Sequence, residues 1–225
     1  MKGLIVVGAG GFGMEVIWVA EEMNAGNPGD PPWELLGYVD DNEEKKGTHI
    51  FGYEVLGRPE DAARRFSDRE ICYHSALGDN LVRRKMAERL DRLGWRAATL
   101  IHPSVIRARG VPVGEGSYIG ALSILTPQSR IGRHVLINQR VAIGHESIVE
   151  DFAQVCSGAQ INGGCQIGQG ALIGSNASIY QGTAVGENAS VGSNSLLVKT
   201  VAPGVSVMGV PARVFYKASS SSPGK

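Results

Sequence analysis

Hydrophobic positions recur with a period of six through the second half of the chain. Every sixth residue is valine, isoleucine or leucine, fifteen times in succession and without an insertion. A helix would place apolar residues three and four apart and a simple strand would alternate them, so neither explains this period. A fixed short period predicts a repeat architecture. The series is Val113, Ile119, Leu125, Ile131, Ile137, Ile143, Val149, Val155, Ile161, Ile167, Ile173, Ile179, Val185, Val191 and Leu197.

Each hexapeptide is predicted to form a short strand and a tight corner. A second small or β-branched residue follows each aliphatic residue by four positions, as at Ser117 and Ala153, and glycine often follows directly, as at Gly144. Glycine and asparagine tolerate the backbone angles of tight corners. Three hexapeptides close one triangular coil, so the series predicts about five coils of a parallel β-helix. Residues 201–217 are predicted to cap its C-terminal end, because the last coil has no neighbour there.

The first hundred residues carry a different pattern. Apolar runs at 3–7, 35–39 and 71–77 predict strands, and residues 80–93 have the apolar spacing of a helix. Strands alternating with helices predict a small parallel sheet with helices on its faces. The expected fold class is therefore an α/β Rossmann-like half domain followed by an all-β parallel β-helix.

The same patterns predict the domain boundaries. We expect the α/β domain over residues 1–100, a linker over 101–112 and the β-helix with its cap over 113–217. The tail at 218–225 (ASSSSPGK) is too polar to bury a core and is expected to be disordered.

Composition narrows the classes of function. The 22 basic and 22 acidic residues balance, which argues against a nucleic-acid partner or an anionic membrane surface. The apolar run at 4–7 is too short for a signal peptide or a membrane span. Cys72, Cys156 and Cys165 are odd in number and widely spaced, so no disulfide framework is expected. A cytoplasmic protein fits these features.

A glycine-rich turn, Gly8-Ala9-Gly10-Gly11-Phe12-Gly13, joins the first strand to the first helix. Its glycines let the backbone approach a phosphate at the helix N-terminus, and Asp40-Asp41 at the end of the next strand can bind a ribose or a base. A dinucleotide site needs two such halves, and there is room for one. A nucleotide-linked small molecule therefore fits better than NAD, and a plain tight turn is the alternative.

Two histidines, His134 and His145, are the main titratable candidates in the repeat, and Glu146 follows His145 directly. His145 stands two residues after an inward aliphatic position, so it should face outward at or near a corner. Histidine has the pKa of a general base, and a carboxylate would fix its tautomer. Neighbouring strand side chains point apart, so the pair can couple only if the corner bends them together. A surface histidine on a rigid β-helical spacer is the alternative.

Several motifs in one order carry a family resemblance across the whole chain. They are the GAGGFG turn, GYVDDN at 37–42, LGDN at 77–80 followed by Arg83, LIHPS at 100–104, GHE at 144–146 and GVPA at 209–212. Together they resemble the PglD/NeuD-type sugar O-/N-acyltransferases of the hexapeptide-repeat superfamily. These bacterial enzymes acetylate an amino or hydroxyl group of a sugar for surface glycans or sialic acid. The resemblance implies a left-handed β-helix, a homotrimer and acetyl-CoA as co-substrate.

The resemblance also implies roles for individual residues, with His145 as the general base and Glu146 orienting it. No metal is expected, because the related β-helix carbonic anhydrases need three converging histidines. Phe12 and Gln154 stand where relatives often carry histidines, which leaves the substrate open. The implied acetyl-CoA contacts are Gln154, Gly163, Gly174, Ser175, Ser193 and Lys199, with Arg213 a further candidate for the phosphates. The implied contacts to a nucleotide sugar are Gly8, Gly10, Gly11, Phe12, Asp40, Asp41 and Gly78.

The expected function is acetyl-CoA-dependent N-acetylation of a nucleotide-linked amino sugar in polysaccharide biosynthesis. Transfer would be direct, with Gln154 or a backbone N–H stabilising the oxyanion. Cys156 has no evident activating base, so a thiol nucleophile is not favoured. Two alternatives stay open: O-acetylation of sialic acid or another sugar, and a non-catalytic sugar-nucleotide-binding trimer.

Overall fold

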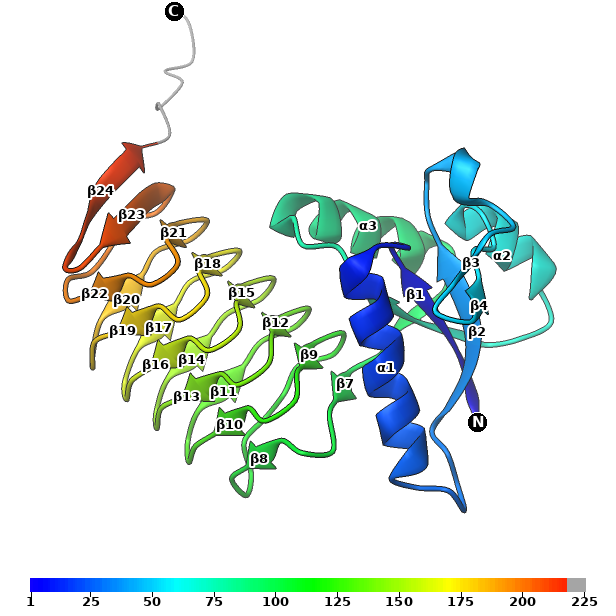
Figure 1. Cartoon of the computed structure of the whole chain (residues 1–225), viewed down its shortest axis with the longest axis horizontal. Helices are drawn as coiled ribbons and strands as arrows, with labels where there is room; N and C mark the ends of the chain where they lie inside the picture. Colours follow the sequence, from blue (N-terminus) through cyan, green and yellow to red (C-terminus); the bar gives the residue numbers. More distant parts are fainter. Residues whose placement is uncertain (218–225) are drawn as a thin grey trace, which may run out of the picture.

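A computed structural model describes residues 1–217, and the predicted disordered tail at 218–225 lies outside the described residues. The N-terminal part contains a parallel sheet with strand order β2-β1-β5-β6 and a small antiparallel pair, β3-β4 (Figure 1). The predicted strands and the predicted helix over 80–93 are confirmed. The elements are β1 (Lys2–Val7), α1 (Gly11–Ala25), β2 (Trp33–Val39), the 3-10 helix η1 (Glu43–Lys45), β3 (His49–Ile50), β4 (Tyr53–Glu54), α2 (Pro59–Arg65), β5 (Ile71–Ser75), α3 (Asn80–Arg92) and β6 (Arg96–Ala97).

Both faces of this sheet are buried, and alternate residues of each strand point to opposite faces. Leu4 and Val6 of β1 belong to a core shared with α1 and the start of the β-helix. Ile5 and Val7 belong to a second core on the other face, which includes residues of α2 and α3. Strands buried on both faces are typical of parallel sheets covered by helices.

The repeat forms a prism of three parallel sheets, which we call face 1, face 2 and face 3. Each strand pairs with the third strand after it in the series, as Leu136 does with Gln154, so three hexapeptides make one coil. Face 1 contains β7 (Leu100–Ile101), β9 (Tyr118–Ile119), β12 (Leu136–Ile137), β15 (Gln154–Val155), β18 (Leu172–Ile173) and β21 (Ser190–Val191). Face 2 contains β8 (Ile106–Arg107), β10 (Ile124–Leu125), β13 (Ala142–Ile143), β16 (Gln160–Ile161), β19 (Ser178–Ile179) and β22 (Leu196–Leu197). Face 3 contains β11 (Arg130–Ile131), β14 (Ile148–Val149), β17 (Gln166–Ile167) and β20 (Ala184–Val185).

The aliphatic series forms the core of the prism, as predicted. From Ile119 to Leu197 every member of the series is buried, and the small residues between them are buried as well. Inward serines form hydrogen bonds with backbone groups: the Ser117 hydroxyl donates to the Gly132 carbonyl of the next coil at 2.8 Å, and the Ser129 hydroxyl donates to the Thr126 carbonyl at 2.7 Å. The corners use left-handed backbone even where the residue is not glycine, as at His134 with a φ of 53° and Phe152 with a φ of 59°.

The β-helix begins earlier than the sequence pattern predicted. Residues 101–112 were expected to be a linker, yet Ile101 pairs with Ile119, and β8 within this stretch pairs in parallel with β10. These residues therefore belong to the first coil. Arg107 occupies the aliphatic position of β8, opposite Leu125, and is exposed at the end of the prism. The arginine interrupts the period of six, which hid this coil.

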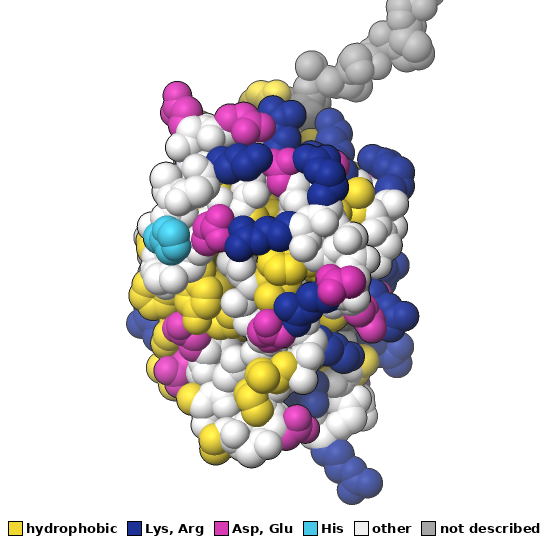
Figure 2. All heavy atoms as spheres, turned by 90° about the vertical axis from the view of Figure 1, so that its right-hand side faces the viewer, with side chains coloured by type: hydrophobic (Ala, Val, Ile, Leu, Met, Phe, Trp, Pro, Cys, Tyr) yellow, Lys and Arg dark blue, Asp and Glu magenta, His cyan; other side chains and the backbone are white. Residues whose placement is uncertain are grey.

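The far end of the prism carries an antiparallel hairpin of β23 (Val205–Gly209) and β24 (Ala212–Lys217), within the predicted cap. Figure 1 places this hairpin at the opposite end from the α/β domain. Figure 2 shows basic and acidic side chains intermixed over the outer face of that domain, without a field of one sign. Within residues 1–217, no helix is both long and apolar enough to cross a bilayer.

Candidate functional site

His145 and Glu146 form a hydrogen-bonded pair at the corner between face 2 and face 3. The corner lies between β13 and β14, and Glu146 there has a φ of 60°. This left-handed residue bends the chain so that His145 Nδ1 and Glu146 Oε2 lie 3.0 Å apart. The two side chains are 59% and 61% exposed, so the pair stands on the surface of the chain. The corner thus supplies the bend that coupling of the pair requires.

Gly163 lies one coil further along the same corner, and the His145 imidazole packs against it. A Cβ atom on Gly163 would stand 2.4 Å from His145 Nε2, and its three nearest atoms would all belong to the imidazole ring. The ring therefore lies against a bare stretch of backbone. A groove of about 780 Å³ opens beside it. The groove is lined by Thr126, Pro127, Ala142, Ile143, Gly144, His145, Gln160, Ile161, Asn162, Gly163, Tyr180 and Gln181.

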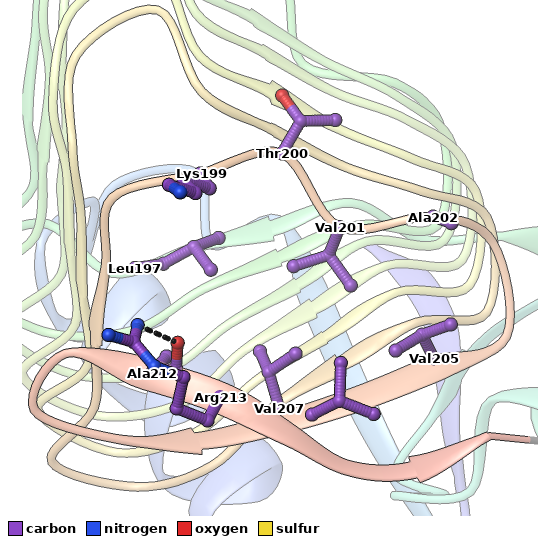
Figure 3. A pocket seen from close by; sticks show the side chains of 10 residues that line it. Leu197, Lys199, Thr200, Val201, Ala202, Val205, Val207, Ala212 and Arg213 are labelled. Carbon is purple, nitrogen blue, oxygen red and sulfur yellow. Dashed lines mark hydrogen bonds between the residues drawn. The ribbon is translucent and has the colours of Figure 1, made fainter.

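The corner of His145 recurs once in every coil toward the C-terminus. Gly163, Gln181 and Lys199 occupy the equivalent positions of the next three coils. With a strand spacing of about 4.8 Å, Lys199 lies roughly 14 Å along the prism from His145. Lys199 also borders a cavity of about 640 Å³ between the last coil and the C-terminal hairpin. Figure 3 shows Leu197, Val201 and Val207 pointing into this cavity, with Lys199 and Arg213 on the same side of the view.

The other predicted acetyl-CoA contacts lie elsewhere on the prism. Gln154 stands on face 1, and Gly174, Ser175 and Ser193 stand at the corner between face 1 and face 2. Ser175 and Ser193 are stacked one coil apart, as counting by coils predicts. Gln154 lies half a coil from His145, so it cannot reach that histidine of its own chain. The structure brings Gly163 and Lys199 to the corner of His145 but not the other four residues.

Gln154 and Cys156 contact each other on face 1. The Gln154 amide nitrogen lies 3.8 Å from Cys156 Sγ, and the Gln154 side-chain oxygen is buried without a partner in the described residues. Burial raises the pKa of the Cys156 thiol, against a weaker opposing effect of the Gln154 contact. A thiol with a raised pKa is a poor nucleophile at neutral pH. Within residues 1–217, no three His, Cys, Asp or Glu side chains are grouped so that they could hold a metal ion.

Asp40 stabilises the glycine-rich turn through hydrogen bonds. Asp40 Oδ2 accepts hydrogen bonds from the Ala9 backbone N–H and from Lys45 Nζ, both at 2.9 Å. Burial would raise the pKa of Asp40, but these bonds and one from the Asn42 backbone outweigh it and hold that pKa below its usual value. A Cβ atom on Gly13 would lie 2.2 Å from the Gly8 carbonyl oxygen, so only glycine fits there.

The turn borders a cavity at the carboxyl edge of the sheet. A Cβ atom on Gly10, Gly11 or Gly78 would meet nothing within 4 Å, so these glycines face open space. The adjoining cavity has a volume of about 210 Å³. Asp41 borders it and also pairs with Arg89 at 2.9 Å. The cavity is lined by Val7, Gly8, Val39, Asp40, Asp41, Pro59, Leu77, Val82 and Met86.

Phe12 faces the β-helix and does not line this cavity. Its ring packs edge-on against Tyr118 of face 1, with centroids 5.3 Å apart and an interplanar angle of 81°. Near by, Glu15 of α1 accepts a hydrogen bond of 2.6 Å from the Gln139 amide. The first turn of α1 therefore adjoins face 1 and its corner with face 2, the same side of the prism as Gln154 and Ser175.

Sequence reasoning missed some residues that the structure brings to these places. Tyr180 and Gln181 line the groove beside His145, and Gln181 was available by counting two coils on from His145. Arg83 and Asn80 belonged to a quoted motif without a role, and both donate hydrogen bonds to the β-helix. No local pattern around Arg83 distinguishes it from the exposed arginine beside it.

Two family models match the chain. The model of the PglD N-terminal domain matches residues 3–90, and the model of the bacterial transferase hexapeptide (six repeats) matches residues 164–199. The chain thus carries a PglD-type N-terminal domain followed by bacterial transferase hexapeptide repeats. The predicted fold class, a Rossmann-like half domain before a left-handed β-helix, is thereby confirmed.

Several solved structures are similar to this protein over nearly all of its chain. The acetyltransferase domain of PglB from Neisseria gonorrhoeae is 28% identical, with 95% of this chain and 100% of that chain covered and a TM-score of 0.83. WeeI from Acinetobacter baumannii is 27% identical over 95% and 100%, with a TM-score of 0.85. A mutant of perosamine N-acetyltransferase from Caulobacter crescentus, in complex with CoA and GDP-perosamine, is 23% identical over 95% and 97%, with a TM-score of 0.85. This last likeness shows a shared fold.

Proposed function

We propose that this acyltransferase uses acetyl-CoA to acetylate the amino group of a nucleotide-linked sugar, with His145 as general base, in the biosynthesis of a bacterial glycan. The observation that carries the proposal is the pair of His145 and Glu146 beside the 780 Å³ groove, with the imidazole lying against Gly163. The PglB acetyltransferase domain supports the co-substrate, because that protein has been solved in complex with acetyl coenzyme A and is 27% identical.

The His145 hydrogen bond to Glu146 assigns the chemistry of the ring. With Nδ1–H donating to the carboxylate, Nε2 carries the lone pair and can accept a proton. His145 removes the proton from the sugar amine as that nitrogen attacks the thioester carbonyl. The amide C–N bond forms, the C–S bond breaks, and His145 passes the proton to the departing sulfur, so that CoA leaves as a thiol. The positive charge on the imidazole in between is stabilised by Glu146.

The proposed site is completed by a second copy of the chain. Gln154, Gly174, Ser175 and Ser193 lie on a different side of the prism from His145. If one copy lays its His145 corner against face 1 of the next, the contact is head-to-tail, and three such contacts close a ring. We therefore propose a homotrimer in which each site takes His145 from one copy and Gln154 from its neighbour. This arrangement also covers a catalytic base that is 59% exposed in one protomer.

The nucleotide sugar is proposed to bind at the glycine-rich turn. Gly10 and Gly11 face open space, and unpaired N–H groups at the start of α1 favour phosphate oxygens. The adjoining apolar cavity with Asp41 at its rim suits part of the nucleoside. Because this turn adjoins face 1, the sugar would extend toward Gln154 and toward the His145 of the neighbouring copy.

A thiol-release assay tests the proposal. Acetyl-CoA is offered with a panel of nucleotide-linked amino sugars and of hydroxyl acceptors, using the wild type, His145→Ala and the surface control His49→Ala. We expect release of CoA with an amino sugar, a loss of about 10²–10⁴-fold in His145→Ala, and no change in the control. Unchanged transfer in His145→Ala refutes the general base, and activity on hydroxyl acceptors alone refutes N-acetylation. Sedimentation should give three times the 23.8 kDa chain mass, and a monomer would refute the shared site.

A further inference from the structure

Three successive corners of the β-helix present carbonyl oxygens to helix α3. His134, Phe152 and Gly170 lie on consecutive coils at the corner between face 3 and face 1, and all three have positive φ angles. At this corner the hydrogen bonds between coils use the carbonyl of the residue before each corner residue. The Phe152 N–H donates to the Arg133 carbonyl, and the Gly170 N–H donates to the Asp151 carbonyl. The carbonyls of the three corner residues are thereby left to accept bonds from α3.

Arg83 and Asn80 of α3 use these carbonyls. Arg83 donates from Nη2 to the Phe152 carbonyl at 2.6 Å and from Nε to the His134 carbonyl at 3.3 Å. Asn80 donates from Nδ2 to the Gly170 carbonyl at 2.6 Å. Arg83 also donates to the Asn80 side chain and to the Leu77 carbonyl, at 2.9 and 2.8 Å. One helix turn thus contacts three consecutive coils.

Arg83 is an unusual cation, because it is only 1% exposed and its hydrogen bonds within the described residues go to carbonyl and amide oxygens, not to a carboxylate. Burial lowers its pKa to about 10, and Asp79 opposes this effect. Such a buried guanidinium is costly to replace, since any smaller or apolar side chain leaves those acceptors without donors. Because the bonds from Arg83 and Asn80 end on three consecutive coils, they also fix where α3 stands along the prism.

Another part of the same helix, together with the loop before it, borders the proposed nucleotide site. Leu77, Val82 and Met86 line the cavity that also contains Gly8 and Asp41. The position of α3 on the prism therefore sets the height of this cavity along the β-helix axis. In the proposed symmetric trimer the coils of all copies lie at the same heights, so α3 also sets the height at which a bound sugar meets the His145 corner of the neighbouring copy.

We propose that Arg83, together with Asn80, is a positioning residue that fixes the nucleotide-sugar site in register with the coil carrying His145. A slip by one coil would displace the sugar by about 4.8 Å along the axis. A misplacement of only about 1 Å can cost about 100-fold in rate. The inference rests on the proposed function, because it assigns the sugar to the α/β domain and the base to the β-helix.

The experiment compares Arg83→Met, Arg83→Lys and Asn80→Ala with the control Arg84→Met. Arg84 is the neighbouring arginine and is half exposed. It pairs loosely with Glu88 at 3.9 Å and its guanidinium lies 5.9 Å from the centre of the Phe152 ring, but within the described residues it donates to none of the three corner carbonyls. Two acceptors are used: the nucleotide-linked amino sugar, and the corresponding amino sugar without nucleotide, at saturating acetyl-CoA. We expect Arg83→Met to lose about 100-fold in kcat/KM for the nucleotide-linked acceptor, with Arg83→Lys and Asn80→Ala between it and the wild type. The KM for acetyl-CoA and the slow transfer to the nucleotide-free sugar should stay within threefold.

The outcomes separate the two proposals. An inactive wild type would refute the proposed function itself. An active wild type with fully active Arg83→Met and Asn80→Ala would overturn the positioning role. Equal losses with both acceptors would also overturn it, because they indicate general damage to the fold. If Arg83→Met does not fold, as judged by circular dichroism and chain mass, the Asn80→Ala and Arg83→Lys results decide in the same way.

Discussion

Replacing Gly163 with alanine should displace the proposed general base while leaving the fold intact. The added Cβ would lie 2.4 Å from His145 Nε2, whereas ordinary van der Waals contact begins at 3.4 Å, so the ring must move by 1.0 Å. Gly163 has no positive φ, so alanine fits its backbone. The imidazole is exposed and can swing into solvent, and we expect the free energy of unfolding to change by less than about 1 kcal/mol. A displacement of the base by about 1 Å should cost about 100-fold in kcat/KM.

Two other glycines provide matched controls for Gly163→Ala. In Gly144→Ala the Cβ would meet the backbone of Asn162 and Gly163 at 2.5 Å, so we expect a loss of about 2–3 kcal/mol in stability. In Gly29→Ala it meets nothing within 4 Å, and neither quantity should change. Urea denaturation and the thiol-release assay measure the two quantities. Wild-type activity in Gly163→Ala, or an activity loss that follows its stability loss, would refute the role assigned to the ring position.

Two further predictions concern buried titratable groups. Burial lowers the pKa of His74 to about 4. Between pH 6.5 and 4 the unfolded chain therefore binds more protons than the folded chain. The contribution of His74 to stability is complete above pH 6.5 and is lost as the pH falls. From pH 7 to 5 this histidine should cost at most about 2 kcal/mol, and His74→Gln should flatten the urea-midpoint profile; an unchanged slope would contradict the assignment. Cys156→Ala should retain transfer within threefold, because burial raises the pKa of that thiol and the proposed transfer forms no acyl-enzyme; an inactive variant with intact fold would revive a thiol nucleophile.

Much of the fold could be predicted from the sequence because one short period imposes the prism. The aliphatic series from Ile119 to Leu197 is buried as expected, since each inward position has the same environment in every coil. The first coil escaped prediction because Arg107 replaces the aliphatic residue at the exposed end. Strand and helix positions in the α/β domain followed from apolar runs and helical spacing in the same way.

The candidate site was less predictable, because a site is assembled by distance across the prism. Counting by whole coils places Lys199 above His145 and Ser193 above Ser175, so each column could be read from the sequence. The nine-residue spacing also places Gln154 half a coil from His145. Counting cannot give the 3.0 Å contact between His145 and Glu146, which depends on the left-handed backbone of Glu146. The burial of Arg83 could not be predicted either, because its partners on the β-helix are backbone carbonyls, which every residue has.

The register between α3 and the coils also bears on how such chains can change length in evolution. An insertion of one full coil beyond Gly170 would lengthen the groove by one layer and leave the anchored corners where they are. An insertion into the coils that is not a multiple of six would turn aliphatic residues outward in the later coils. An insertion of six or twelve would keep them inward but move every later residue to another face, so only whole coils of 18 residues preserve both the core and the columns of the groove. Lineages of this architecture should therefore differ in length by whole turns downstream of the anchor, and reach for a longer or shorter co-substrate can be gained without rebuilding the acceptor site.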